Sequence, residues 1–68
     1  MGSQSTTRGR AIQAARIAKG YSRPEVAATL TRDTQTVTRW ENGTHTPSEA
    51  VLLKLASLFD VDPAKLVD

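Results

Sequence analysis

Apolar residues recur along the chain at three- and four-residue spacing, in short runs separated by glycine, proline or small polar residues. This spacing is typical of amphipathic helices that bury one side. It predicts five short helical segments: residues 8–19, 22–30, 34–41, 48–59 and a last turn at 62–66. The fourth segment is the most apolar, with Val51, Leu52, Leu55, Ala56, Leu58 and Phe59. The pattern therefore predicts an all-α fold, a compact bundle of five helices.

Two of the predicted helices begin with a serine that is suited to cap them. Ser22 and Glu25 have the spacing of a capping box, in which each side chain accepts a hydrogen bond from the backbone N–H of the other residue. Ser48 precedes the apolar fourth segment and is expected to cap it in the same way through its hydroxyl.

Residues 31–38 are ambiguous because they are rich in threonine, which favours strands. Asp33, however, is a good N-cap residue, and residues 42–43 (Asn-Gly) are typical of a helix end. No other segment of the chain is left to pair with a strand. We therefore assign residues 34–41 to a helix.

Length and composition exclude several classes of protein. The 68 residues suffice for one domain, which we expect to span residues 8–68, after a flexible N-terminal segment 1–7 that partly derives from cloning. The chain has no cysteine and one histidine, which excludes thiolate sites and argues against a zinc site. There is no recognisable catalytic triad or glycine-rich phosphate loop. We predict no enzyme activity, no cofactor and no small-molecule ligand.

The net charge of +2 is unevenly distributed. Residues 1–43 hold seven Arg or Lys and three acidic residues, which gives +4, whereas residues 44–68 hold two Lys and four acidic residues, which gives −2. A basic first part favours an anionic partner, although ordinary surface charge explains the division equally well. The apolar runs are short and no signal peptide is recognisable, so we expect a cytoplasmic protein without a membrane partner.

The third predicted helix has a polar side that nothing else in the chain is expected to cover. If Val37 and Trp40 point inward, a rotation of about 100° per residue places another set of side chains outward. This outer set is Gln35, Thr38, Arg39 and Asn42. Arg can donate two hydrogen bonds to guanine, Gln can pair with adenine, and Thr offers a hydroxyl and a methyl group. These residues favour contact with DNA bases, and a merely polar surface is the alternative.

The order of motifs resembles the lambda-repressor and Cro family of helix-turn-helix proteins, the xenobiotic-response-element type. The resemblance extends from about residue 8 to residue 67. It rests on Ala-Ala-Arg-Ile-Ala-Lys-Gly-Tyr-Ser at 14–22, Arg-Trp-Glu-Asn-Gly at 39–43, Pro-Ser-Glu-Ala-Val-Leu-Leu-Lys-Leu-Ala at 47–56 and Phe-Asp-Val-Asp-Pro-Ala-Lys-Leu at 59–66. It implies that the second and third helices form the helix-turn-helix and that the third lies in the major groove of double-stranded DNA.

The resemblance also implies roles for individual residues. Base contacts fall to Thr34, Gln35, Arg39 and, as an accessory, Thr38. Phosphate contacts fall to Ser22, Arg23, Arg32, Thr36, Asn42 and Thr44. Arg16 and Glu41 are expected to form a partly buried ion pair that orients the third helix.

The inter-helix turn departs from the family pattern of a glycine followed by an apolar residue. Here Thr31 must adopt a left-handed backbone or change the shape of the turn, and Arg32 is expected to point to solvent or to a phosphate. Asp33 replaces the more common serine or threonine cap and brings a negative charge close to the DNA.

A single small domain contacts few base pairs, so we expect a homodimer bound to an inverted repeat, acting as a transcriptional repressor. The candidate dimer interface is Val61, Leu66 and Val67, which could instead close the core of the monomer. The alternative function is a protein-interaction module of the same fold, such as an antitoxin or a coactivator, with weak DNA binding.

Overall fold

The computed structural model describes residues 4–66 and contains α-helices and one 3₁₀ turn, with no strand in this range. The elements are α1 (Gln4–Lys19), α2 (Arg23–Leu30), α3 (Thr34–Glu41), α4 (Glu49–Phe59) and η1 (Pro63–Leu66). The all-α prediction is confirmed. The predicted number of five helices is corrected to four, because the fifth predicted segment forms only a four-residue 3₁₀ turn.

α1 begins at Gln4, four residues before the predicted start at Arg8. The added turn is polar, so the apolar spacing used for the prediction could not indicate it. The helix ends at Lys19 and is followed by Gly20, whose φ of 81° lies in the left-handed region that glycine adopts without strain. Its N–H donates to the Ile17 carbonyl at 2.9 Å, and the Tyr21 N–H donates to the Arg16 carbonyl at 3.1 Å.

The turn between α2 and α3 is tight, and a threonine occupies its left-handed position. Thr31 has φ 56° and ψ 47°, and its N–H donates to carbonyls in the last turn of α2. Thr31 thus adopts the left-handed backbone, the first of the two expected outcomes. The expected side-chain cap of α3 by Asp33 is wrong: its exposed carboxylate makes no capping hydrogen bond, and only its backbone carbonyl accepts the Thr36 N–H, at 2.9 Å.

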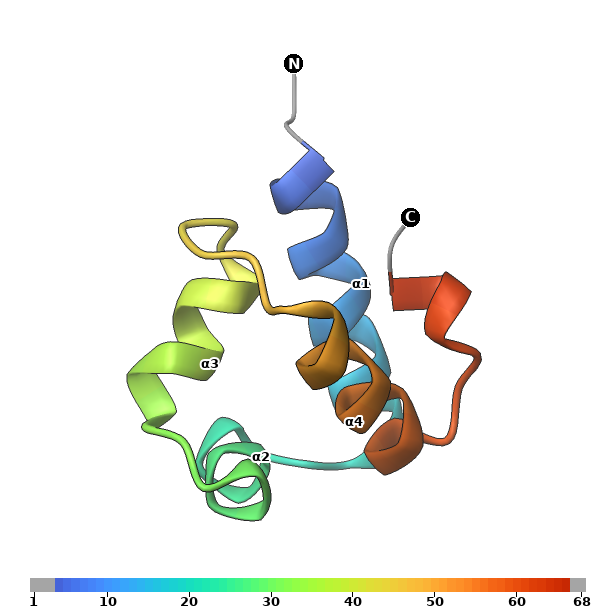
Figure 1. Ribbon diagram of the computed structural model, residues 1–68. Coiled ribbons are helices and arrows are strands. Elements are labelled where there is room, and N and C mark those ends of the chain that lie inside the picture. The colour runs from blue at the N-terminus through green and yellow to red at the C-terminus, as the bar shows by residue number, and fades with distance from the viewer. Residues whose placement is uncertain (1–3, 67–68) are drawn as a thin grey trace.

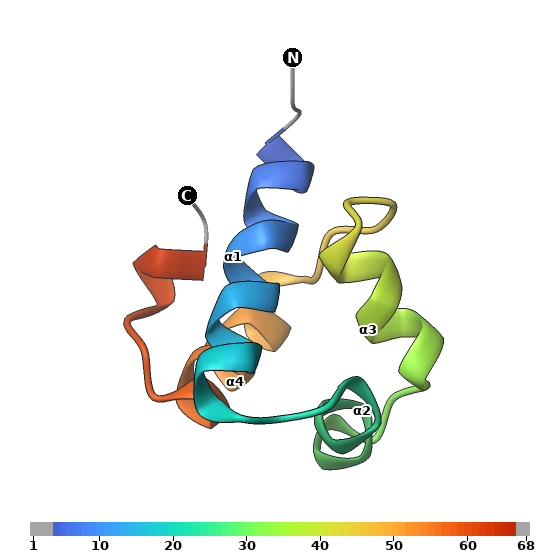
Figure 2. The same ribbon diagram turned by 180° about the vertical axis from the view of Figure 1, so that it is seen from behind.

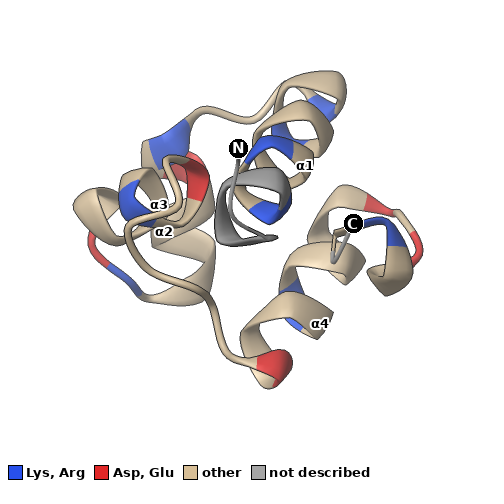
Figure 3. Cartoon of the chain, turned by 90° about the horizontal axis from the view of Figure 1, so that it is seen from above, with Lys and Arg blue, Asp and Glu red and all other residues tan. Residues whose placement is uncertain are grey.

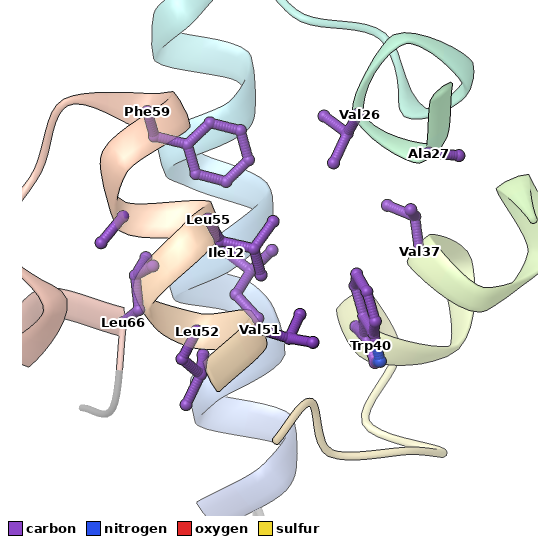
Figure 4. Packing of buried hydrophobic residues seen from close by; sticks show 11 residues of the cluster. Ile12, Val26, Ala27, Val37, Trp40, Val51, Leu52, Leu55, Phe59 and Leu66 are labelled. Atoms are coloured by element: carbon purple, nitrogen blue, oxygen red, sulfur yellow. The ribbon is translucent and has the colours of Figure 1, made fainter. Parts of the chain in front are cut away.

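The hydrophobic core joins all five elements. Figure 4 shows side chains of α1, α4 and η1 on one side, facing side chains of α2 and α3 on the other. The buried hydrophobic residues are Ile12, Val26, Ala27, Val37, Trp40, Val51, Leu52, Leu55, Ala56, Phe59 and Leu66. Val37 is fully buried and Trp40 is 5% exposed, so the inward direction assigned to α3 is confirmed.

The packing leaves α3 at the edge of the molecule. α3 packs against α2 and α1, whereas α4 packs against α1 and η1 (Figure 1). The view from behind shows α2 close to the beginning of α3, with the far side of α3 turned away from the other helices (Figure 2). This arrangement holds one side of α3 firmly and leaves the opposite side accessible.

A glycine sets the distance between α1 and α3. Gly9 is buried, and a Cβ atom added to it would lie 2.4 Å from the Glu41 carbonyl oxygen and 2.6 Å from the Trp40 carbonyl oxygen. Only a residue without a side chain permits this approach. The C-terminal end of α3 is therefore fixed directly against the backbone of α1.

The candidate dimer residues have different positions. Leu66 is 1% exposed and belongs to the core of the monomer, so its side chain is not accessible to a second copy. Val61 is half-buried and packs against the same core. Val67 lies outside the described residues.

No helix in the described part of the chain is long and apolar enough to cross a membrane.

Candidate nucleic-acid interface

The outer side of α3 presents the four residues that were assigned to base contacts. Gln35 and Arg39 are exposed, whereas Thr34 and Thr38 are half-buried. The short α3 contains only eight residues, so its polar side rises by about 12 Å, enough for a few base pairs. The four side chains are therefore grouped on the accessible side of one rigid helix.

The hydrogen-bonding groups on this surface are not equally available. The Thr38 hydroxyl donates to the Thr34 carbonyl at 3.3 Å, which leaves its methyl group and its oxygen lone pairs for an external partner. Among the described residues, the Gln35 amide and the Arg39 guanidinium have no hydrogen bond or ion pair. Gln35 and Arg39 are therefore the two exposed side chains of this surface with free N–H donors, and the half-buried Thr34 adds a hydroxyl with no partner among the described residues.

The N-terminus of α2 has a complete capping box, in which most of the backbone N–H groups at this end already donate hydrogen bonds. The Ser22 N–H donates to Glu25 Oε1 at 2.7 Å, and the Glu25 N–H donates to Ser22 Oγ at 3.2 Å. Pro24 has no N–H. Among the backbone amides of the first turn, only the Arg23 N–H has no partner in the described part of the chain, whereas the exposed Ser22 hydroxyl accepts a hydrogen bond and keeps its proton to donate to a phosphate.

The capping box also changes the acidity of a carboxyl group. The hydrogen bond from the Ser22 backbone N–H, together with the Ser22 hydroxyl, holds the pKa of Glu25 below its usual value of 4.5. Glu25 therefore stays ionised to a lower pH than an ordinary glutamate and places a negative charge next to Arg23.

The predicted ion pair between Arg16 and Glu41 is present and is part of a larger cluster. Arg16 Nε lies 2.6 Å from Glu41 Oε2, and its Nη2 lies 3.3 Å from Oε1. Arg16 Nη1 also donates to the Tyr21 carbonyl at 2.8 Å. The Glu41 side chain is only 2% exposed. The pair therefore joins α1, the loop before α2 and the end of α3.

A second arginine binds the same carboxylate, which was not predicted. Arg23 Nε donates to Glu41 Oε1 at 2.9 Å, and the Arg23 side chain is 40% exposed. The two residues are 18 positions apart and in different helices, so no local spacing in the sequence could indicate the contact. The cluster of two guanidinium groups and one carboxylate has a net charge of +1, and the nearby Glu25 carboxylate offsets this charge in part.

The loop after α3 is held by its own polar groups. Asn42 Oδ1 accepts the Thr44 N–H at 2.9 Å, and the His45 N–H donates to the Arg39 carbonyl at 3.2 Å. Asn42 and Thr44 are both exposed. For a phosphate contact, Asn42 thus retains its amide NH₂ group and Thr44 retains its hydroxyl.

A hollow of about 400 Å³ lies between α3 and the beginning of α4. Its lining combines two arginines and a histidine with an apolar part, namely Arg32, Thr36, Arg39, Trp40, His45, Thr46, Pro47, Ser48 and Val51. Arg32 in the turn before α3 and Thr36 of α3, which were assigned to phosphate contacts, thus line the hollow together with Arg39, which was assigned to a base. No acidic residue of the described range lines the hollow, so its surface favours anions.

Acidic residues occur on both sides of the molecule. Figure 3 shows the acidic positions that follow α4 on the opposite side of the molecule from α3. Lys19 of α1 approaches Asp60 at 3.7 Å, in a pair whose side chains are largely exposed. Within residues 4–66, no group of three or more His, Cys, Asp or Glu could hold a metal ion.

Comparison with known proteins agrees with this geometry. A family model described as helix-turn-helix matches residues 12–66. Among solved structures, a similar one is the crystal structure of the restriction-modification controller protein C.AhdI from Aeromonas hydrophila, with a TM-score of 0.81 and 31% sequence identity. The match covers 90% of this chain and 92% of that chain. No curated protein sequence matches the chain.

Proposed function

The chain belongs to the Cro/C1-type helix-turn-helix family of DNA-binding transcription regulators, and we propose that it acts as a repressor that contacts the bases of a specific operator through α3. The observation that carries this proposal is the surface of α3. Its inner side is fixed by buried Val37 and Trp40, while Gln35 and Arg39 on the outer side are exposed and have no partner within the described residues.

The free donors on α3 match particular base edges. Arg39 is suited to donate two hydrogen bonds to O6 and N7 of a guanine, and Gln35 is suited to pair with N6 and N7 of an adenine. Thr34 and Thr38 add shorter contacts, and the methyl group of Thr38 is suited to a thymine methyl. The preferred half-site should therefore contain a guanine and an adenine that α3 contacts directly.

The phosphate contacts surround this surface. Arg23 at the beginning of α2 and Asn42 with Thr44 after α3 would hold the DNA backbone on the two sides of the groove. Arg32 and Thr36 in the basic hollow would bind a further phosphate. Such contacts set the orientation of the domain on DNA and make binding dependent on salt.

We further propose that two copies bind an inverted repeat. The longest dimension of the molecule is 32 Å, close to the separation of about 34–36 Å between half-sites one helical turn apart. Two domains can therefore lie side by side on one face of the DNA, with half-buried Val61 and residue 67 as the candidate contact. Because the chain is similar to a restriction-modification controller protein, we propose a comparable biological role, the control of gene expression.

The experiment that tests the proposal is a selection of bound duplexes from a random-sequence DNA pool near physiological salt. We expect an enriched inverted repeat whose half-sites are centred one helical turn apart and contain a guanine and an adenine. A single unrepeated half-site would contradict the dimer. No enrichment at all would contradict DNA recognition and would favour a protein-interaction module of the same fold.

A further inference from the structure

We propose that Glu41 is a positioning residue for Arg23: it fixes one edge of the Arg23 guanidinium so that the other edge binds a DNA phosphate, and lysine cannot replace arginine there. This inference rests on the proposed function, because it concerns how the same site binds DNA. It assigns to Glu41 a role in binding in addition to its ion pair with Arg16.

At the beginning of α2, Arg23 is the only cationic side chain of the helix that can bind a phosphate. The Ser22 and Glu25 amides are already bonded within the capping box, at 2.7 and 3.2 Å, and Pro24 has none. The backbone there offers only the Arg23 N–H, and the Glu25 carboxylate repels an anion. The Ser22 hydroxyl keeps its proton to donate, but the guanidinium group is the one cationic group at this end of α2, so the charge attraction for a phosphate depends on it.

Glu41 itself is held firmly in place. Its carboxylate is 2% exposed and accepts hydrogen bonds from Arg16 at 2.6 and 3.3 Å. Arg16 is anchored in turn to the Tyr21 carbonyl at 2.8 Å. A carboxylate held in this way provides a rigid support for a second donor.

Arg23 is this second donor, and its geometry leaves part of the guanidinium free. Arg23 Nε donates to Glu41 Oε1 at 2.9 Å, which uses one of the five N–H groups of the guanidinium. The two terminal nitrogens have no partner among the described residues, and the side chain is 40% exposed. Because Arg16 already balances the Glu41 charge, the positive charge of Arg23 remains available to an anion.

Lysine would not reproduce this arrangement. Its ammonium group is a single point of charge, whereas the planar guanidinium can bind a carboxylate with one edge and a phosphate with another. A lysine at position 23 that approaches Glu41 would therefore leave the phosphate without a partner. Arg10 of α1 is exposed, has no ion pair in the described part of the chain and is assigned no contact with DNA, so it is expected to tolerate lysine.

The test uses the duplex selected by the wild-type protein and measures affinity at several salt concentrations. We expect Arg23→Lys and Arg23→Ala to bind about ten-fold more weakly than wild type. Both should lower the magnitude of the slope of log K against log salt by about 0.9, the value for one phosphate. The control Arg10→Lys should keep the wild-type affinity and slope. If Arg23→Lys binds with wild-type affinity and slope, charge alone suffices and the inference is overturned.

The role of Glu41 is tested separately, in a Glu41→Gln background and under conditions where melting curves show a folded protein. There, the factor by which the added substitution Arg23→Lys weakens binding should fall from about ten toward one. An unchanged factor would contradict positioning by Glu41. In the wild-type protein, the NMR signal of the Arg23 Nε–H should persist with and without DNA; exchange as fast as that of the Arg39 Nε–H in the free protein would also overturn the inference.

The two levels of failure can be distinguished. If wild type selects no duplex, the proposed function fails and this inference falls with it. If wild type binds a selected duplex while Arg23→Lys behaves as wild type, only the positioning role fails.

Discussion

Gly9 offers the sharpest test of how α3 is held in place, because its replacement by alanine sets two effects against each other. Alanine is the better helix former, and in an α-helix it gains about 1 kcal/mol over glycine. At this position, however, the new Cβ would lie 2.4 Å from the Glu41 carbonyl oxygen and 2.6 Å from the Trp40 carbonyl oxygen. Both neighbours are backbone atoms, which cannot rotate away.

The cost follows from these distances. Ordinary contact begins at 3.4 Å, so α1 and the end of α3 must separate by about 1 Å. Overpacking of a well-packed site costs about 1–3 kcal/mol, and a clash with backbone belongs at the upper end of this range. After the gain in helix propensity, we expect Gly9→Ala to lower the free energy of unfolding by about 2 kcal/mol. In a domain of this size the melting temperature should fall by about 8–16 °C.

The assay is thermal and urea unfolding followed by circular dichroism. The matched control is Ala14→Gly at an exposed position of the same helix, which should lose about 1 kcal/mol through propensity alone. If Gly9→Ala were as stable as wild type or more stable, helix propensity would dominate at position 9. The close approach of α1 to α3 would then be wrong.

Three further substitutions test other parts of the structure. Glu41→Ala leaves buried Arg16 without its carboxylate and should cost about 3–5 kcal/mol of unfolding free energy; an unchanged melting temperature would exclude the ion pair. The lowered pKa of Glu25 means that its stabilising contribution is present above pH 4.5 and is lost as the pH falls through the folded-state pKa. Glu25→Gln should therefore flatten the acid loss of stability in urea unfolding, and identical pH profiles would contradict the capping box. Thr31→Gly should raise stability by up to about 1 kcal/mol, because glycine adopts φ 56° without strain; a loss in urea unfolding would count against that.

Local patterns in the sequence were sufficient for the parts of the fold that depend on local interactions. The direction of α3 follows from Val37 and Trp40, three residues apart, and both are buried. The capping box needs only the spacing of Ser22 and Glu25, and both of its hydrogen bonds are present. These features depend on residues within one helical turn, whose geometry is nearly independent of the rest of the chain.

Features that depend on the packing of separate elements could not be predicted in the same way. Arg23 was assigned to a phosphate on its position alone, and its bond to Glu41 exists only because α2 and the end of α3 meet. In the sequence, Gly9 cannot be distinguished from any other glycine in a helix, because its role depends on the packing of α1 against α3. Leu66 was open to two interpretations, and its burial depends on where η1 packs. The base and phosphate contacts themselves remain predictions.

The central claim is that α3 contacts bases through its outer side chains, and the most direct test is to repeat the duplex selection with Arg39→Ala. We predict that one guanine in each half-site loses its preference, at a cost of about 1–3 kcal/mol on the wild-type operator, while the other positions and the spacing stay unchanged. A selected sequence identical to that of wild type would contradict this claim, because Arg39 would then not contact a base.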